Sequence, residues 1–240
     1  MSVTWIPPAA PPVSCQRRNV STVPNKSSPA AAFSRALDLA DEQGVNLLGT
    51  LTWAFEFEDQ PPFAGFRSLA SDGIDLPVLN VFRMFSQMGG QQLAVESDAA
   101  MPLDAVLKNG VRTRPDVSAL ASLESNRLCV LVWHYHDDDA PGPAAEVKLA
   151  LDGLPAKITK AQVRHFRIDA NHSDAFTVWQ RMGSPLTLSP KQFAELEKAG
   201  QLAELEPPKK IRVENGRTTL HLNLPREAVS LLVVEWNAPQ

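Results

Sequence analysis

The chain has 240 residues, of which 44% are hydrophobic and 21% are charged, and its formal net charge is −4. This composition is typical of a soluble globular protein with enough apolar residues for a sizeable core. Acidic and basic residues are mixed along the chain, with no basic stripe and no polybasic patch. The sequence therefore gives no reason to expect a nucleic-acid or membrane partner.

Cysteine use and hydropathy set further limits. Cys15 and Cys129 are far apart and belong to no C-x-x-C pair, so we expect free thiols and no metal site or cofactor. No stretch has the roughly 18 to 20 continuous apolar residues of a membrane span, and the first residues do not resemble a signal peptide. A cytoplasmic location is the default expectation, although a longer gene product could carry a signal that this chain has lost.

Residues 1–29 are predicted to be irregular or disordered. They are rich in proline, and their apolar residues follow neither the helical nor the strand period. If the codons for Trp5–Val13 are read one base upstream, they permit the amino-acid sequence D-P-A-G-C-A-A-C. A shifted reading frame is therefore one hypothesis for this segment. A natural proline-rich linker is the alternative.

Residues 30–92 are predicted to form helix, strand and helix. Apolar residues recur at helical spacing from Phe33 to Ala40, and Gly44 follows as a stop signal. The continuous apolar run Val45–Phe55 is typical of a strand buried on both faces of a parallel sheet. A second amphipathic helix is predicted over Pro77–Met88. This order is the rhythm of an α/β barrel, of which one unit is present.

Residues 93–240 are predicted to form an antiparallel β-sandwich, because short apolar segments alternate with turn signals. Asn215-Gly216 is a strong hairpin signal, and a helix is expected over Ser189–Ala199, with Ser189 as its cap and Pro190 in its first turn. The predicted strands are Leu128–Tyr135, Val147–Leu151, Gln162–Ile168, Lys210–Val213, Thr218–Leu224 and Val229–Trp236.

Two segments carry a resemblance to a known family. The first is Thr50–Asp59, continued by Pro62–Phe66 and Gly73-Ile74, and the second is His172–Phe176 with Trp179 and Met182–Pro185. The first segment resembles the eighth barrel strand, and the loop after it, of glycoside hydrolase family 39, a family of β-xylosidases. The second is similar to a loop of that family's accessory sandwich. The two matches occur in the expected order. The resemblance implies an α+β chain that is the remnant of a (β/α)₈ TIM barrel, its last strand and helices, followed by an antiparallel β-sandwich.

The resemblance also implies an activity, the hydrolysis of terminal β-xylosyl residues with retention. Retention needs a nucleophilic carboxyl and an acid/base carboxyl about 5 to 5.5 Å apart. In the family these glutamates follow the fourth and seventh barrel strands, both of which precede the strand that contains Trp53 here. No catalytic residue is therefore assigned, and the isolated chain is expected to be inactive unless a missing N-terminal barrel portion completes it.

Substrate-binding candidates follow the predicted barrel strand, where barrel enzymes place their sites. Trp53 can stack on a sugar ring, and Glu56, Glu58 and Asp59 can accept hydrogen bonds from sugar hydroxyls. A core tryptophan and a solvated acidic loop are the structural alternatives. The expected ligands, inferred from the family, are xylo-oligosaccharides or aryl β-xylosides.

A second group of candidates lies in the sandwich. His172, Asp174 and Trp179 are expected to order a loop rather than to transfer protons, since no nucleophile motif accompanies them. His134 and His136 face the same side of a predicted strand and could suggest a metal site, but a strand end running into an acidic turn is the preferred interpretation. A non-catalytic carbohydrate-binding β-sandwich module is the main alternative function, and a non-enzymatic interaction domain is a third.

Overall fold

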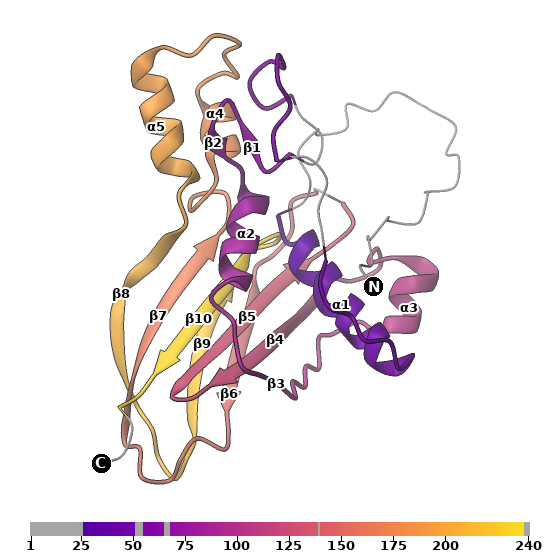
Figure 1. Ribbon diagram of the computed structural model, residues 1–240, viewed down its shortest axis with the longest axis vertical. Coiled ribbons are helices and arrows are strands. Elements are labelled where there is room, and N and C mark those ends of the chain that lie inside the picture. The colour runs from indigo at the N-terminus through magenta and orange to yellow at the C-terminus, as the bar shows by residue number, and fades with distance from the viewer. Residues whose placement is uncertain (1–25, 51–54, 65–67, 139, 238–240) are drawn as a thin grey trace.

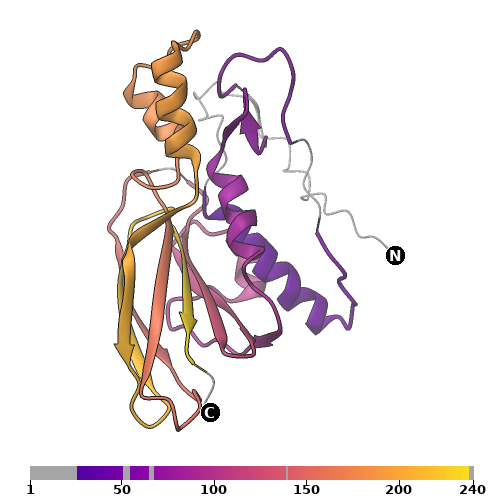
Figure 2. The same ribbon diagram turned by 60° about the vertical axis from the view of Figure 1, so that its left-hand side comes forward.

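The computed structural model describes residues 26–50, 55–64, 68–138 and 140–237, and these form three layers. A six-stranded antiparallel sheet lies in the middle, with helices on one face and a two-stranded sheet on the other (Figures 1 and 2). The antiparallel sandwich predicted for the later part of the chain is thus present. Helices α1 (Ser28–Glu42) and α2 (Pro77–Phe85) form the helical layer.

The strands follow a fixed spatial order. The large sheet runs in the order β3 (Gln91–Leu93), β4 (Asp116–Glu124), β5 (Arg127–Tyr135), β10 (Val229–Glu235), β7 (Lys160–Ile168) and β8 (Ala203–Arg212). The small sheet pairs β6 (Ala145–Leu151) with β9 (Thr218–Leu224). The remaining elements are the short hairpin β1 (Ala70–Ser71) and β2 (Ile74–Asp75), with helices α3 (Leu103–Asn109), α4 (Ala175–Arg181) and α5 (Pro190–Gly200).

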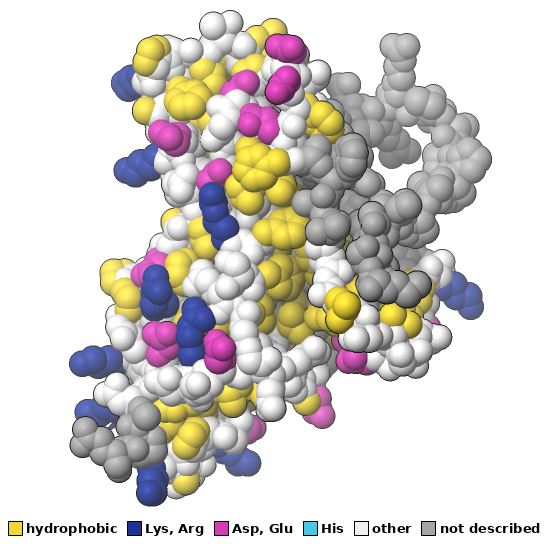
Figure 3. All heavy atoms as spheres, in the orientation of Figure 1, with side chains coloured by type: hydrophobic (Ala, Val, Ile, Leu, Met, Phe, Trp, Pro, Cys, Tyr) yellow, Lys and Arg dark blue, Asp and Glu magenta, His cyan; other side chains and the backbone are white. Residues whose placement is uncertain are grey.

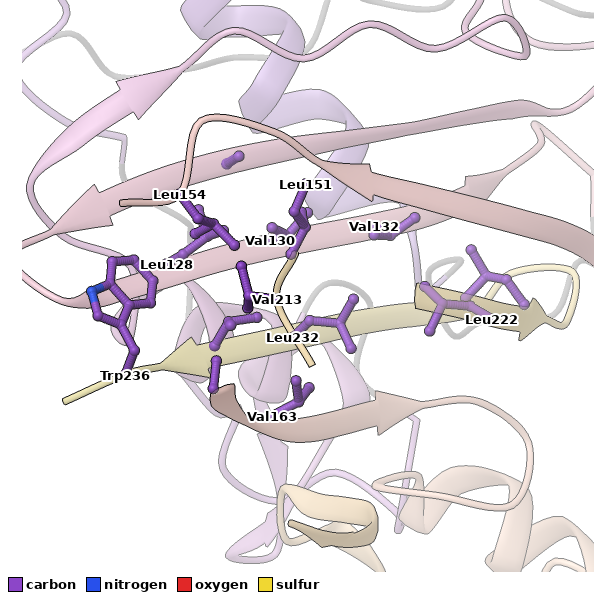
Figure 4. Packing of buried hydrophobic residues seen from close by; sticks show 14 of the residues in the cluster. Leu128, Val130, Val132, Leu151, Leu154, Val163, Val213, Leu222, Leu232 and Trp236 are labelled. Atoms are coloured by element: carbon purple, nitrogen blue, oxygen red, sulfur yellow. The ribbon is translucent and has the colours of Figure 1, made fainter. Parts of the chain in front are cut away.

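The sandwich core lies between the two sheets (Figure 4). Strand β5 is apolar from Leu128 to Trp133: Leu128, Val130 and Val132 point into this core, while Cys129, Leu131 and Trp133 belong to the cluster under the helices. Successive side chains of a strand point to opposite faces, so a stretch covered on both faces is apolar at consecutive positions. Burying each large side chain contributes about 1.5–3 kcal/mol.

Aromatic contacts join the two helices of the helical layer to each other, and one buried carboxylate fixes α1 to the sheet. The Phe33 ring of α1 lies 5.3 Å from Phe82 and 5.6 Å from Phe85 of α2, edge to face. Asp116 of β4 is 1% exposed, and it accepts hydrogen bonds from Arg35 Nη2 at 2.8 Å and from Trp133 Nε1 at 3.0 Å. A buried charge is tolerated when it is paired and hydrogen-bonded, so Asp116 fixes α1 to the sheet.

The buried barrel strand predicted over Val45–Phe55 is not found in its described part. Residues 45–50 have no regular secondary structure and are mostly exposed, and Phe55 is 58% exposed. Residues 51–54 lie outside the described part of the chain. An apolar run forms a strand only when neighbouring strands satisfy its backbone, and no strand of the described residues lies beside this one. That expectation was wrong for residues 45–50.

The hairpin predicted at Asn215-Gly216 is half right. Both residues have positive φ, 52° and 73°, and Glu214 and Arg217 exchange two backbone hydrogen bonds of 2.9 Å, so the tight turn forms. The strands that it joins nevertheless pair in different sheets, β8 with β7 and β9 with β6. The turn therefore carries the chain from one layer of the sandwich to the other.

Most other boundaries differ from the prediction by small amounts, but β8 begins at Ala203 rather than at the predicted Lys210. Helix α1 begins at Ser28, so the last two residues of the segment expected to be irregular are helical, and residues 1–25 lie outside the described part. The sheet begins at Gln91, within the segment assigned to the barrel. Helix α5 has the predicted cap at Ser189 and Pro190 in its first turn, and the structure adds a capping box between Ser189 and Gln192. Within the described residues, no helix has the length and apolar character that crossing a membrane requires.

Candidate functional site

The loop that carries the predicted acidic residues is held at both ends by backbone hydrogen bonds. The carbonyl of Phe55 accepts hydrogen bonds from the N–H groups of Leu69 and Ala70, at 2.8 and 3.0 Å. The hairpin of β1 and β2 follows, and its turn residues Asp72 and Gly73 both have positive φ. These hydrogen bonds bring Phe55, at one end of the loop, against Leu69 and Ala70 at the other end.

The three acidic candidates have different surroundings. Glu56 accepts a 2.8 Å hydrogen bond from the N–H of Gly73, so it stabilises the hairpin turn. Glu58 and Asp59 are exposed, and Asp59 has a φ of 56°, which aspartate tolerates better than most residues. Trp53, the candidate stacking residue, lies outside the described residues. The structure therefore brings Glu58 and Asp59 together on an open loop.

An aromatic cluster fastens this loop to the sandwich. Phe63 lies in the loop, has a φ of 60° and is 2% exposed. Its ring centroid lies 5.0 Å from that of Trp179 and 5.9 Å from that of Phe176, and these two rings are 5.7 Å apart. Trp179 Nε1 also donates to the carbonyl of Pro185 at 3.0 Å. Aromatic pairs at such distances add about 0.5–1.5 kcal/mol beyond their burial, so the loop is firmly anchored.

The cluster lies beyond the end of the large sheet, where α4, α5 and the β1–β2 hairpin meet (Figures 1 and 2). Leu196 of α5 and Ile74 of β2 are fully buried there, beside Phe63. Sequence reasoning gave no role to Phe63 or Phe176. The spacing of Phe176 and Trp179, three residues apart on one helical face, was the signal available for Phe176, whereas no local pattern marked Phe63.

His172 is paired with a carboxylate that sequence reasoning missed. His172 Nδ1 lies 2.8 Å from Asp169 Oδ1, and the two residues also form an isolated backbone bridge. Burial raises the pKa of Asp169, but hydrogen bonds from the N–H of Asn171 and from His172, with the nearby Arg167 charge, hold that pKa below its usual value. An ionised carboxylate is thus fixed at the base of this loop.

A buried chain of polar groups continues from Asp169 into the sheet. Arg167 Nη1 lies 3.5 Å from Asp169 Oδ2, and its Nε donates to Ser230 Oγ at 2.8 Å. His165 Nε2 lies 3.0 Å from the same hydroxyl. Burial, with the adjacent Arg167 charge, lowers the pKa of His165 to about 4, so this imidazole is neutral at pH 7. The Ser230 hydroxyl is fully buried, which leaves a substrate no access to it.

Asp174 caps helix α4 and binds the N-terminal side of the chain. Its carboxylate accepts a 3.1 Å hydrogen bond from the N–H of Thr177 and a further one from the Thr177 hydroxyl. Lys26 forms an ion pair with the same carboxylate, whose side chain is fully buried. The contact ties the residue before α1 to the loop of His172, two segments about 150 residues apart in the sequence.

The two histidines considered for metal binding have other contacts. His134 Nδ1 lies 3.0 Å from the carbonyl of Leu224, and burial lowers its pKa. His136 Nδ1 lies 3.0 Å from Asp138. Among the described residues, no group of three or more His, Cys, Asp or Glu side chains is arranged to hold a metal ion.

Comparison with known proteins gives this arrangement a context. The sequence profile described as Glycosyl hydrolases family 39 matches residues 23–217. The alpha-L-iduronidase of Mus musculus is 32% identical over 164 residues, which are 66% of this chain and 24% of that protein.

Two solved structures share the fold. The GH39 enzyme from Xanthomonas axonopodis pv. citri has a TM-score of 0.66 at 21% identity, over 88% of this chain and 40% of that one. A monomeric beta-xylosidase from Caulobacter crescentus CB15 has a TM-score of 0.65 at 20% identity, over 89% of this chain and 42% of that one. These likenesses support the predicted α+β architecture, part of a barrel followed by a sandwich. The chain spans about a quarter of the curated relative and about two fifths of these structures.

Proposed function

This chain belongs to glycosyl hydrolase family 39. We propose that it supplies the sandwich and one substrate-facing loop of a glycosidase that hydrolyses its substrate with retention of configuration. The observation that carries this proposal is the anchored acidic loop. Phe63 fixes the loop to Trp179 and Phe176, while Glu58 and Asp59 stay exposed and can accept hydrogen bonds from sugar hydroxyls. Rigid support for a polar loop is what positioning of a substrate requires.

The acidic loop binds sugar in this proposal but does not carry the chemistry. A catalytic acid must keep its proton near neutral pH, which a carboxyl does when burial removes it from water. Glu58 and Asp59 are exposed, and Glu56 is engaged by the N–H of Gly73. We therefore infer that the nucleophile and the acid/base residue come from outside this chain, and that the chain alone does not hydrolyse glycosides.

The helical face offers a surface for the rest of a barrel. A groove of about 530 Å³ lies among α1, α2 and residues 47–50, lined largely by apolar side chains such as Phe33, Leu48 and Phe85. Leu48 is 70% exposed. In Figure 3, hydrophobic side chains gather over the middle of the molecule, at the level of these helices. Large exposed apolar patches mark interaction sites, so we propose that the remaining barrel packs here.

The substrate that we propose is a terminal β-xylosyl residue of a xylo-oligosaccharide. The acidic loop favours a neutral sugar as the substrate, because Glu56, Glu58 and Asp59 would repel the carboxylate of a uronic acid at close range. An α-L-iduronide is the second candidate, since the iduronidase of Mus musculus is 32% identical over 164 residues. The two candidates differ in one charged group, which makes them separable by experiment.

The test has two steps. First, the purified 240-residue chain is assayed with an aryl β-xyloside, and we expect no turnover above a buffer control. Second, the chain is co-expressed with the barrel portion of a family 39 relative, and aryl β-xyloside is compared with aryl α-L-iduronide. Faster hydrolysis of the xyloside supports the proposal, and faster hydrolysis of the iduronide selects the second candidate.

Two further results would overturn the proposal. Turnover by the chain alone that disappears in Glu58→Gln would show that the acidic loop is catalytic. Calorimetric binding of xylo-oligosaccharides by the chain alone, unchanged in Glu58→Gln and Asp59→Asn, would favour a carbohydrate-binding module whose sugar site lies elsewhere.

A further inference from the structure

We propose that the unpaired edge of β6 is a docking site for one extended polypeptide segment, which adds a third strand to the small sheet. The segment that fits has apolar side chains at alternate positions and basic side chains between them. This site lies on the sandwich, away from the acidic loop, and it is independent of the glycosidase proposal.

Strand β6 has an open edge. It pairs with β9 over seven positions, from Ala145 opposite Leu224 to Leu151 opposite Thr218. In the described part of the chain this sheet has two strands, so the other edge of β6 has no ladder partner. A row of unpaired N–H and C=O groups is a template for another strand.

The edges of the large sheet are protected, and β6 is not. Edge strand β8 contains Pro207 and Pro208, and its register shifts twice against β7. Edge strand β3 has three residues. Prolines, bulges and short length are the devices by which proteins block edge pairing. Strand β6 is seven residues long, contains no proline and pairs with β9 without a register shift.

A groove lies beneath this edge and provides room for a strand. Its volume is about 730 Å³, and its lining comes from residues 95–99, from β4 and β5, and from residues 145–149 of β6. The side chains of Val117, Ala119 and Val132 line it from the large sheet. Stacked sheets lie about 10 Å apart, so a strand beside β6 would rest over these residues and bury its inward side chains.

The wall opposite β6 is fixed to the large sheet. Ser97 Oγ donates to the carbonyl of Val117 at 2.8 Å, and the N–H of Val117 donates to the carbonyl of Ala99 at 3.2 Å. Because residues 95–99 stand beside β4, the groove is bounded on both sides. A single strand fits this arrangement better than the two-stranded sheet of a second copy.

Charges at the groove specify the partner further. Its charged lining residues are Glu96, Asp98, Glu146 and Lys148, three acidic and one basic. Glu146 and Lys148 are exposed at alternate positions of β6, with the half-buried Val147 between them. Opposite charges across a strand pair are stabilising, so basic side chains in the outward positions of the incoming strand complement this rim.

The experiment uses the full 240-residue chain and a labelled peptide, acetyl-Lys-Val-Lys-Val-Lys-Val-Lys-amide. We expect saturable binding by fluorescence anisotropy, weakened by salt, and slower amide hydrogen exchange in residues 144–151 when the peptide is bound. The same peptide with its central valine replaced by proline should bind at least tenfold more weakly, because proline cannot complete the ladder.

A pair of variants locates the site. Ala119→Leu fills the floor of the groove and should weaken peptide binding at least tenfold, while Ala150→Leu, on the exposed side of β6, should leave it unchanged. Thermal unfolding of both variants confirms that they fold. Equal binding of the valine and proline peptides, equal binding of a Lys-Ser alternating peptide, or no effect of Ala119→Leu would overturn the proposal. So would concentration-dependent dimerisation that protects residues 144–151, since the occupant would then be a second copy.

Discussion

At the scale of single residues, the aromatic anchor of the acidic loop leads to the first prediction. Phe63→Ala removes a 2% exposed ring from its contacts with Trp179 and Phe176. Such a truncation costs about 3–5 kcal/mol when the cavity does not collapse. We expect residues 55–64 to exchange their amide hydrogens faster and to be cut first by thermolysin.

Phe57→Ala is the matched control for this loop. Phe57 is 42% exposed and belongs to none of the three buried clusters, so its removal should change stability by less than about 0.5 kcal/mol. Equal protection of residues 55–64 in the two variants would show that Phe63 does not anchor the loop.

The buried imidazole of His165 makes stability depend on pH. Its pKa is about 4 in the folded chain against 6.5 for the ordinary group, so the unfolded chain binds a proton between these values and the folded chain does not. Stability is therefore complete above pH 6.5 and falls as the pH drops toward 4, by on the order of 3 kcal/mol. Urea unfolding at pH 7.0, 5.5 and 4.5 measures this loss.

His165→Gln should reduce the slope of stability against pH, since an amide does not take up this proton. His221→Gln is the control, because His221 is exposed on β9. Part of the slope will remain in His165→Gln, because burial also lowers the pKa of His134. An unchanged slope in His165→Gln would mean that this imidazole is already charged in the folded chain.

At the scale of the elements, the close approach of α5 to β2 depends on one glycine. A Cβ built on Gly200 would lie 2.7 Å from the backbone carbonyl oxygen of Asp75. Gly200→Ala must therefore push the end of α5 away from β2, which we expect to cost about 1–3 kcal/mol. Gly49→Ala, where a Cβ meets nothing within 4 Å, is the control. Thermal unfolding measures both, and equal melting temperatures would contradict the close contact.

The strands that the sequence predicts well are those whose own residues show a clear apolar or alternating pattern. Leu128–Trp133 is apolar at consecutive positions, and Thr218–Leu224 alternates between apolar and polar residues, so both strands could be placed within one residue. Asp116–Glu124 was missed because the serines and alanines at its centre weaken the apolar pattern of a strand. In the folded chain this segment is held as a strand by its backbone pairing with β5. The apolar run at residues 45–50 predicted a strand, but these residues form none, because no neighbouring strand among the described residues pairs with them.

The candidate site could be predicted only in part, because local sequence does not reveal contacts between distant segments. Residues that act alone, such as the cap of α5 at Ser189, follow from local sequence. Residues that act through distant contacts do not. Asp174 was expected to order its own loop, but its ion pair with Lys26 depends on the folded chain. The pairing of Phe63 with Trp179 joins segments more than a hundred residues apart and has no local signal.

At the scale of the whole molecule, the exposed apolar face predicts self-association. Leu48 is 70% exposed beside the groove of α1 and α2, and Leu107 is 66% exposed in a neighbouring, largely apolar pocket of about 590 Å³. We expect the purified chain to form larger species as its concentration rises, measured by light scattering after gel filtration.

The double variant Leu48→Lys, Leu107→Lys should shift this association to higher concentration. Leu186→Lys is the control, since Leu186 is 73% exposed but lies in the loop between α4 and α5. A chain that stays monomeric at high concentration would contradict the prediction, and so would an equal effect of the control.

The position of β10 has a consequence for how the chain is made. This strand, Val229–Glu235, follows the other described strands in chain order, yet it lies between β5 and β7 inside the large sheet. Strands β3, β4 and β5 can pair as they emerge from the ribosome, whereas their connection to β7 and β8 awaits the synthesis of β10. A nascent chain therefore holds two separate half-sheets, each with an exposed apolar edge. A premature stop before Val229 deletes the strand that joins them, and we expect such a product to be a substrate for chaperones and proteases.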